Sequence, residues 1–208
     1  MSDHTLAGRL GALAAWVRQC GSVFWRWEAR LRGVEFQGNA TFLGRPIISV
    51  APRGRIVLGE GVRIASALRA NPLGLAQPAV LRAFAPGAEL LLGPGVGVSG
   101  SVLCAGSRIE VGEQTIFGAG AMVLDNDFHF PVGQWGWGAD SAANARPVII
   151  GRGVFVGARA IVLKGVTIGD RAVVGAGAVV TQDVPAGHLA VGNPARIIAR
   201  QAPDQPES

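Results

Sequence analysis

The chain has 208 residues, of which 49% are hydrophobic and 16% are charged, and it contains 31 glycines. This composition excludes a disordered chain and favours one packed domain with many tight corners, while glycine without a three-residue period excludes collagen. The net charge of +5 comes almost wholly from arginine. Because these arginines are scattered and no aromatic–basic cluster accompanies them, no nucleic-acid partner is expected.

Residues 1–33 are predicted to form an amphipathic helical segment, with a break near Gly21 because glycine weakens a helix interior. Its apolar residues step by four and three positions alternately, which is typical of a helical seam: Leu6, Leu10, Leu13, Val17, Cys20, Phe24, Trp27 and Leu31. Two interpretations stay open. The seam packs on the body of the protein or on a partner subunit, or Trp16, Trp25 and Trp27 rest with flanking arginines on a membrane surface.

Cys20 and Cys104 are isolated in the sequence and lack metal-ligand spacing, so we expect both to be reduced packing residues. The first thirty residues show no secretory signal and no uninterrupted apolar run of spanning length. We therefore expect a cytoplasmic location, with contact to the inner face of the membrane through the N-terminal helix as an open alternative.

Residues 34–198 are predicted to form a solenoid. Aliphatic or compact residues recur there every six positions, often followed by glycine: Leu92, Val98 and Cys104, then Val111, Phe117 and Val123, then Ile150, Val156, Val162, Ile168, Val174 and Val180. A six-residue period fits neither a helix nor plain alternation, and implies a short strand and a corner in each repeat, so that the coils stack. Between Ile64 and Leu92 the phase is lost, which indicates a bulge or an irregular coil.

The run "IGRGVF VGARAI VLKGVT IGDRAV VGAGAV" resembles the hexapeptide-repeat acyltransferases. The resemblance implies an all-β solenoid, a left-handed parallel β-helix with triangular coils of three hexads. That hand would be an exception to the usual right-handed crossover. The expected architecture is thus an N-terminal helix, a β-helix acyltransferase domain at 34–198 with one long projecting loop at 130–149, and a flexible tail at 199–208.

The rhythm breaks at "VLDNDFHFPV". The phase that runs through Val123 lands next on His129, where an aliphatic residue is expected. The next in-phase residue, Ile150, comes 21 positions later rather than 18, so the chain must leave the coil and return displaced. Loops of this length on a solenoid are uncommon and are often functional.

A histidine beside carboxylates can act as a general base. A neutral imidazole can take a proton from a hydroxyl near neutral pH, while a neighbouring carboxylate holds its tautomer. "DNDFHFP" resembles the Asp-x-Asp-x-His segment of sugar O-acetyltransferases, in which the histidine deprotonates the acceptor. We therefore predict that His129 is the catalytic base, with Asp127 or Asp125 as its partner.

The loop offers further candidates for acceptor binding. Trp135 and Trp137 can stack on a sugar ring, although loop tryptophans equally pack a loop onto the body or a neighbouring subunit. Arg146 and Asp125 complete this predicted acceptor-binding set.

The segment "VVGAGAVVTQDVPAGHLAVGNPARII" resembles the closing segment with which these acyltransferases bind coenzyme A. The resemblance implies that Ala158 and Ala176 border the pantetheine arm through their backbones. It further implies that Thr181 and Gln182 lie near the adenine end and that Arg196 approaches the phosphates.

Three further expectations concern the same site. Gly157 lies near the segment that could supply a backbone donor for the developing oxyanion. Gln182 stands where the family often has lysine, and Arg200 is an alternative phosphate contact. The three histidines, at positions 4, 129 and 188, are spread along the chain, and no metal is expected.

The resulting hypothesis is an acetyl-CoA-dependent O-acetyltransferase that transfers the acetyl group directly to a hydroxyl of a sugar or polysaccharide precursor. The resemblance also implies a homotrimer, with donor and acceptor meeting between subunits. Three alternatives stay open: an N-acetyltransferase acting on an amino sugar or a nucleotide-linked amino sugar, an antibiotic O-acetyltransferase, and a non-catalytic solenoid scaffold.

Overall fold

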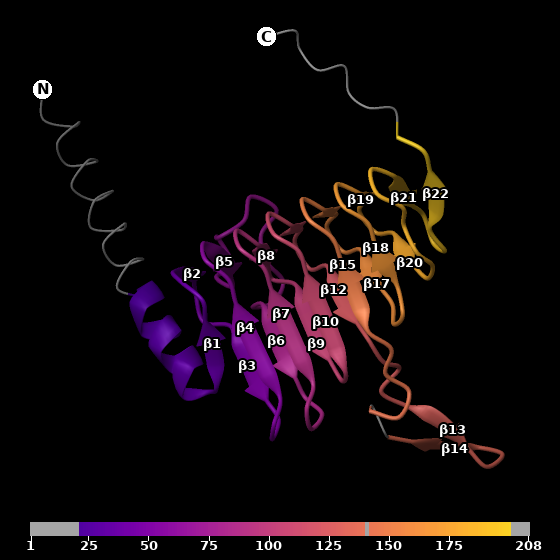
Figure 1. Cartoon of the computed structure of the whole chain (residues 1–208), viewed down its shortest axis with the longest axis horizontal. Helices are drawn as coiled ribbons and strands as arrows, with labels where there is room; N and C mark the ends of the chain where they lie inside the picture. The colour runs from indigo at the N-terminus through magenta and orange to yellow at the C-terminus, as the bar shows by residue number, and fades with distance from the viewer. Residues whose placement is uncertain (1–20, 140–141, 201–208) are drawn as a thin grey trace, which may run out of the picture.

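The computed structural model describes residues 21–139 and 142–200. Residues 21–31 form a helix that covers one end of a long stack of β-coils, and β22 lies at the other end (Figure 1). The predicted helical residues 1–20 and most of the predicted tail, residues 201–208, lie outside the described range. Among the described residues, no helix combines the length and hydropathy needed to cross a membrane.

Three sheets form the sides of the stack, and the chain visits them in turn. Sheet A consists of β1 (Val34–Phe36), β4 (Arg55–Leu58), β7 (Glu89–Leu92), β10 (Arg108–Val111), β15 (Val148–Ile150) and β18 (Thr167–Ile168). Sheet B consists of β2 (Ala40–Leu43), β5 (Val62–Ala65), β8 (Gly97–Ser99), β11 (Ile116–Phe117), β16 (Phe155–Val156), β19 (Val173–Val174), β21 (Leu189–Val191) and β22 (Arg196–Ile198). Sheet C consists of β3 (Ile47–Val50), β6 (Val80–Ala83), β9 (Val102–Ala105), β12 (Met122–Leu124), β17 (Ile161–Val162) and β20 (Val179–Val180).

The coils stack in register, because the strands of successive coils pair in parallel; the last strand, β22, is the exception and pairs antiparallel with β21. Phe117, for example, pairs with Val98 on one side and with Val156 on the other. All three side chains are buried in one continuous apolar core. This stacking explains the six-residue period, since the residue that points inward in one coil lies on its counterpart in the next.

The predicted phase was wrong at one repeat. Leu103, and not Cys104, pairs with Val123 and points into the core, while Cys104 pairs with Leu124. The turn before β9 is one residue shorter than its counterpart before β12, which shifts the strand by one position. Cys104 is nevertheless buried and free. Burial raises the pKa of its thiol to about 11, so the group is an inert packing residue, as expected.

The glycines that follow the strands are required at the corners of the coils because neighbouring coils leave no room for a side chain there. A Cβ atom built on Gly157 would lie 2.5 Å from the backbone nitrogen of Ala176 in the next coil. Such a contact is impossible for a larger residue without moving a coil. The corner between sheets B and C is therefore restricted to small residues.

The outer faces of sheets A and B differ in character. Sheet A carries a ladder of ion pairs, in which Arg55 contacts Glu35 and Glu89, and Arg108 contacts Glu89 and Glu110. Sheet B carries instead a row of apolar residues in register, in its later coils: Ile116, Phe155, Val173 and Leu189. The face of sheet A is thus suited to solvent, and that of sheet B to burial.

Two excursions interrupt the coils. Residues 66–79 connect β5 to β6, in the region where the sequence phase is lost. The second excursion, residues 125–147, connects β12 to β15 and carries the hairpin of β13 (Phe130–Val132) and β14 (Gly136–Gly138), which projects away from the stack (Figure 1). It begins and ends earlier than the predicted loop at 130–149, because Asp125 already forms the turn and Val148 already pairs with Ile109.

Candidate active site

The second excursion leaves the stack at the edge where the chain passes from sheet C to sheet A, which we call the CA edge. Its first residue, Asp125, is fully buried. The Asp125 carboxylate accepts hydrogen bonds from the backbone N–H groups of Gly106 (2.7 Å), Ser107 (2.7 Å) and Arg108 (2.8 Å), which form the corner of the preceding coil. Asn126 donates a fourth bond from its side-chain amide, at 2.9 Å.

This environment corrects the predicted role of Asp125. A carboxylate that is buried and already accepts four hydrogen bonds cannot contact an acceptor sugar, nor is it free to orient a histidine. Its role is to fix the start of the excursion on the preceding coil, because it satisfies one buried backbone donor, that of Gly106, and two partly buried ones, those of Ser107 and Arg108.

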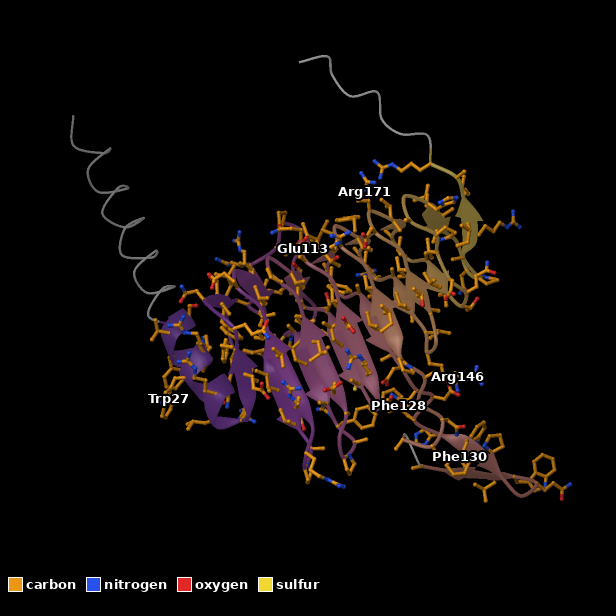
Figure 2. The ribbon with its side chains drawn as sticks, in the orientation of Figure 1. Trp27, Glu113, Phe128, Phe130, Arg146 and Arg171 are labelled. Carbon is orange, nitrogen blue, oxygen red and sulfur yellow. The ribbon has the colours of Figure 1, made fainter. Side chains whose placement is uncertain are left out.

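A tight turn follows and presents His129. The backbone N–H of Phe128 donates to the side-chain oxygen of Asn126 at 2.9 Å, and that of His129 donates to the carbonyl of Asp127 at 2.6 Å. Phe128 has a φ of 60°, a left-handed conformation that is unusual for a bulky residue. Its ring stacks on Phe84 with centroids 5.5 Å apart, and Figure 2 shows Phe128 at the base of the hairpin. The stacking holds this turn in place, and unusual backbone of this kind is frequent at functional sites.

His129 itself is exposed. The carboxylate of Asp127 is ion-paired with Lys164, which lies at the CA edge one coil further on. The predicted contact between Asp127 and the His129 ring is therefore not present in this structure. Asp127 instead ties the turn to the next coil, so that Asp125, Phe128 and Asp127 each fix the segment before His129 to a different coil.

The predicted acceptor-binding residues separate into two groups. Trp135 and Trp137 lie on the hairpin with 87% and 74% of their surface exposed. Arg146 lies instead at the base of the hairpin (Figure 2). Its backbone N–H donates a hydrogen bond to the backbone carbonyl of Asp125 at 2.7 Å. The structure does not bring Arg146 together with the two tryptophans.

The predicted coenzyme A residues also fall into two groups. Thr181, Gln182 and Arg196 line one open cavity of about 870 Å³ beside the last coil, together with the turn at residues 191–195. Gly157, Ala158 and Ala176 lie on another edge, where the chain passes from sheet B to sheet C; we call it the BC edge.

Thr181 and Gln182 follow β20 at the CA edge, two coils beyond the turn that carries His129. Neighbouring strands are about 4.8 Å apart, so the two segments are separated by roughly 10 Å along the stack. Lys164 lies on the coil between them. The CA edge therefore carries an exposed histidine, a lysine–aspartate pair and an open cavity in succession.

Two residues of this arrangement, Lys164 and Phe128, were not predicted. Lys164 is the only lysine in the chain, which was a usable signal. Its contact with Asp127 joins two residues on either side of most of the excursion. The six-residue repeat therefore could not predict this contact. Among residues 21–139 and 142–200, no cluster of three or more His, Cys, Asp or Glu side chains could hold a metal ion.

Residues 147–182 match a family profile described as "Hexapeptide repeat of succinyl-transferase". This range covers the coils from β15 to β20. No curated protein sequence matches the chain significantly.

Several solved structures are similar in fold. The N-acyltransferase AntD from Bacillus cereus, in complex with dTDP and 3-hydroxybutyryl-CoA, superposes with a TM-score of 0.61 at 20% identity, over 85% of this chain and 88% of AntD. PerB from Caulobacter crescentus, in complex with CoA and GDP-perosamine, is 22% identical with a TM-score of 0.42 over 80% of this chain, which spans only 58% of PerB. A maltose O-acetyltransferase from Clostridium difficile 630 is 18% identical with a TM-score of 0.45, over 90% of this chain and 89% of that enzyme.

At these identities the superpositions carry information on the fold alone, and AntD is the one of the three whose similarity is high enough for that argument. The parallel three-sided stack, the repeat profile and the AntD superposition agree with one another. The chain therefore has the left-handed parallel β-helix fold, and its residues 147–182 match the hexapeptide repeat.

Proposed function

We propose that this protein is an acyltransferase that moves an acyl group, most simply acetyl, from coenzyme A to a hydroxyl of a sugar or polysaccharide precursor. One observation carries the proposal. An exposed histidine is held on a turn that is fixed by Asp125, Phe128 and Asp127, and it shares the CA edge with an open cavity next to Thr181 and Gln182. The projecting hairpin supplies two exposed tryptophans on the same excursion.

The proposed mechanism is direct transfer. His129 accepts the proton of the acceptor hydroxyl as the oxygen attacks the thioester carbonyl. The carbon–sulfur bond then breaks, and the departing thiolate takes the proton from His129. Acyl group, proton and thiol balance without any further reactant.

The residues at the end of the stack fit coenzyme A. The cavity of about 870 Å³ is open and lies within reach of the Arg196 guanidinium, which suits a phosphate. Ala158 and Ala176 lie at the BC edge, and we propose that the pantetheine arm runs beside these small residues. This edge lies on the opposite side of sheet C from His129, so we propose that the thioester meets His129 of a neighbouring subunit.

A homotrimer would bring these edges together, and we propose it as the functional assembly. The apolar row on the outer face of sheet B supports association, since Ile116 and Phe155 are each about half exposed in the single chain, at 50% and 47%. A heterologous contact repeated three times closes into a ring.

The amine acceptor is the second candidate, because AntD is described as an N-acyltransferase in complex with dTDP. Free-thiol release with acetyl-CoA and a panel of sugars, sugar nucleotides and nucleotide-linked amino sugars separates the two. Acceptor-dependent release with a hydroxyl substrate supports the proposal, and release only with amines selects the alternative. Calorimetry with coenzyme A is run in parallel, and failure to bind it would overturn both and leave a scaffold.

Lys164 provides a sharper test of how the turn is held. Replacing Lys164 with methionine removes the partner of Asp127, and we expect kcat to fall about tenfold because His129 is less well placed. Thermal stability should change by less than about 1 kcal/mol, since the two side chains are partly exposed, at 26% and 54%.

The Lys164→Arg variant keeps the positive charge and should retain most of the activity. KM for acetyl-CoA should not change in either variant. A lower melting temperature with kcat preserved would show that the ion pair is structural only.

A further inference from the structure

The helix at residues 21–31 has two contrasting faces. One face packs on the first coil: Ala29 is buried, Trp25 packs against the core, and the Ser22 hydroxyl accepts a hydrogen bond from the backbone of Phe42 at 2.9 Å. None of these three helix residues belongs to the predicted seam. The described seam residues Phe24, Trp27 and Leu31 are exposed, so the predicted packing of the seam on the body of the protein is wrong for this part of the chain. Trp25, which was expected to face a membrane in the alternative interpretation, packs on the body instead.

The opposite face is apolar and exposed. Val23, Phe24, Trp27 and Leu31 are exposed to 55%, 51%, 56% and 68%, respectively. They follow one another at helical spacing on the side away from the coils, and Figure 2 shows Trp27 pointing away from the body. The rings of Phe24 and Trp27 lie 6.2 Å apart, so the two aromatic residues form a single patch. We call these four residues the outer helix face.

Basic residues border the outer helix face on the side of the first coil, where Arg26 donates a hydrogen bond to Asn39 and Arg30 lies over the Phe36 ring. Arg26, Arg30 and Arg32 belong to the helix or to the turn after it, and the Arg45 guanidinium lies 5.9 Å from the Trp25 ring centroid. Glu28 pairs with both Arg32 and Arg45, and it is the only acidic residue in this part of the helix. The four arginines together with Glu28 therefore keep a net positive charge beside the outer helix face.

These observations identify what the face contacts. An amphipathic helix with aromatic and aliphatic residues on one side and arginines beside them suits the interface of a bilayer that contains anionic lipids. A second copy of the chain fits less well, because symmetric contact through this face would bring the arginines of two subunits together, and like charges at an interface are unfavourable.

We propose that the outer helix face binds the surface of an anionic phospholipid membrane, with Phe24 and Trp27 inserted among the headgroups and acyl chains. The stack of coils then extends away from the bilayer with the helix at its base. This binding is independent of the acyltransferase chemistry proposed above.

The test uses the full-length protein and vesicles of phosphatidylcholine, with and without phosphatidylglycerol, in a sedimentation assay. Binding to the mixed vesicles is expected, and it should weaken with salt and without the anionic lipid. The Phe24→Ser/Trp27→Ser double variant should bind at least about tenfold more weakly, because two large apolar side chains that are transferred from water into the bilayer on binding have been removed. Both residues are more than half exposed, so the variant should keep its melting temperature.

The matched control is Leu68→Ser/Leu73→Ser, which removes two leucines of comparable exposure, 66% and 75%, from the excursion at residues 66–79. It should bind as the parent does. A brominated phosphatidylcholine should quench the tryptophan emission of the parent, and less so that of Trp27→Phe.

Absence of binding by the parent, or equal binding by the double variant, would overturn the proposal. Loss of self-association in the double variant with unchanged vesicle binding would also overturn it and assign the face to a second copy.

Discussion

Replacement of His129 by alanine should lower kcat by about 10²–10⁴-fold, which is the range for loss of a positioned general base. The reason is that the two neighbouring carboxylates of the described turn are already engaged: Asp125 is buried under four hydrogen bonds, and Asp127 is paired with Lys164. Steady-state rates of thiol release with a saturating acceptor measure the effect.

The side chain of His129 is exposed, so its removal should change the free energy of unfolding by no more than about 0.5 kcal/mol. KM for acetyl-CoA should also stay near the parent value, because the histidine is expected to act on the acceptor. A variant that binds acetyl-CoA normally but turns it over slowly would thus locate the defect in the chemical step.

His188 offers a matched control, since it is the other histidine among the described residues. Its ring lies 3.0 Å from the carbonyl of Ala186 in a turn remote from the CA edge. His188→Ala should keep full activity. If His129→Ala retained the parent rate, His129 would have no part in the mechanism and the proposed site would have to be abandoned.

Much of the fold could be predicted from the period because each residue of a solenoid contacts its counterpart one coil away. Val156, Val162 and Val174 occupy core positions as the spacing predicts. The slip at Leu103 shows the limit of that argument, since one residue fewer in a single corner changes which side chain points inward.

The site was harder to predict because it lies where the period ends. The pattern marked the break at His129, but it could not show that Asp125 serves the fold and Asp127 pairs with Lys164. The hydrogen bonds of Asp125 to residues 106–108 span 17 to 19 positions, which is close to the length of one coil. They could therefore have been predicted from the repeat. The Asp127–Lys164 contact spans 37 positions across the excursion and follows no repeat.

Asp125 is expected to give the largest effect on stability. Replacing it with alanine removes the acceptor for three backbone N–H groups at the corner of residues 106–108 and leaves a gap beside them. Buried donors without partners cost roughly 1–3 kcal/mol each, so we expect a loss of about 3–5 kcal/mol after partial relaxation and entry of water. For a protein of this size that corresponds to a fall of about 10 °C in Tm, measurable by calorimetry.

Two variants separate this effect from a general loss of charge. Asp125→Asn keeps one acceptor oxygen and should lie between the parent and Asp125→Ala. Asp127→Ala removes a carboxylate two residues away that is 54% exposed, and should cost no more than about 1 kcal/mol. Equal losses for Asp125→Ala and Asp127→Ala would contradict the role given to Asp125.

The same substitution also tests how the site depends on the fold. Because Asp125 fixes the first residue of the excursion, the turn that carries His129 should become less ordered in Asp125→Ala even at temperatures where the coils remain folded. Activity at 25 °C should then fall together with hydrogen-exchange protection of residues 106–108 and 126–129, while protection in β16 to β19 stays unchanged. Reduced protection throughout the stack would mean that Asp125 supports the solenoid as a whole and not the site in particular.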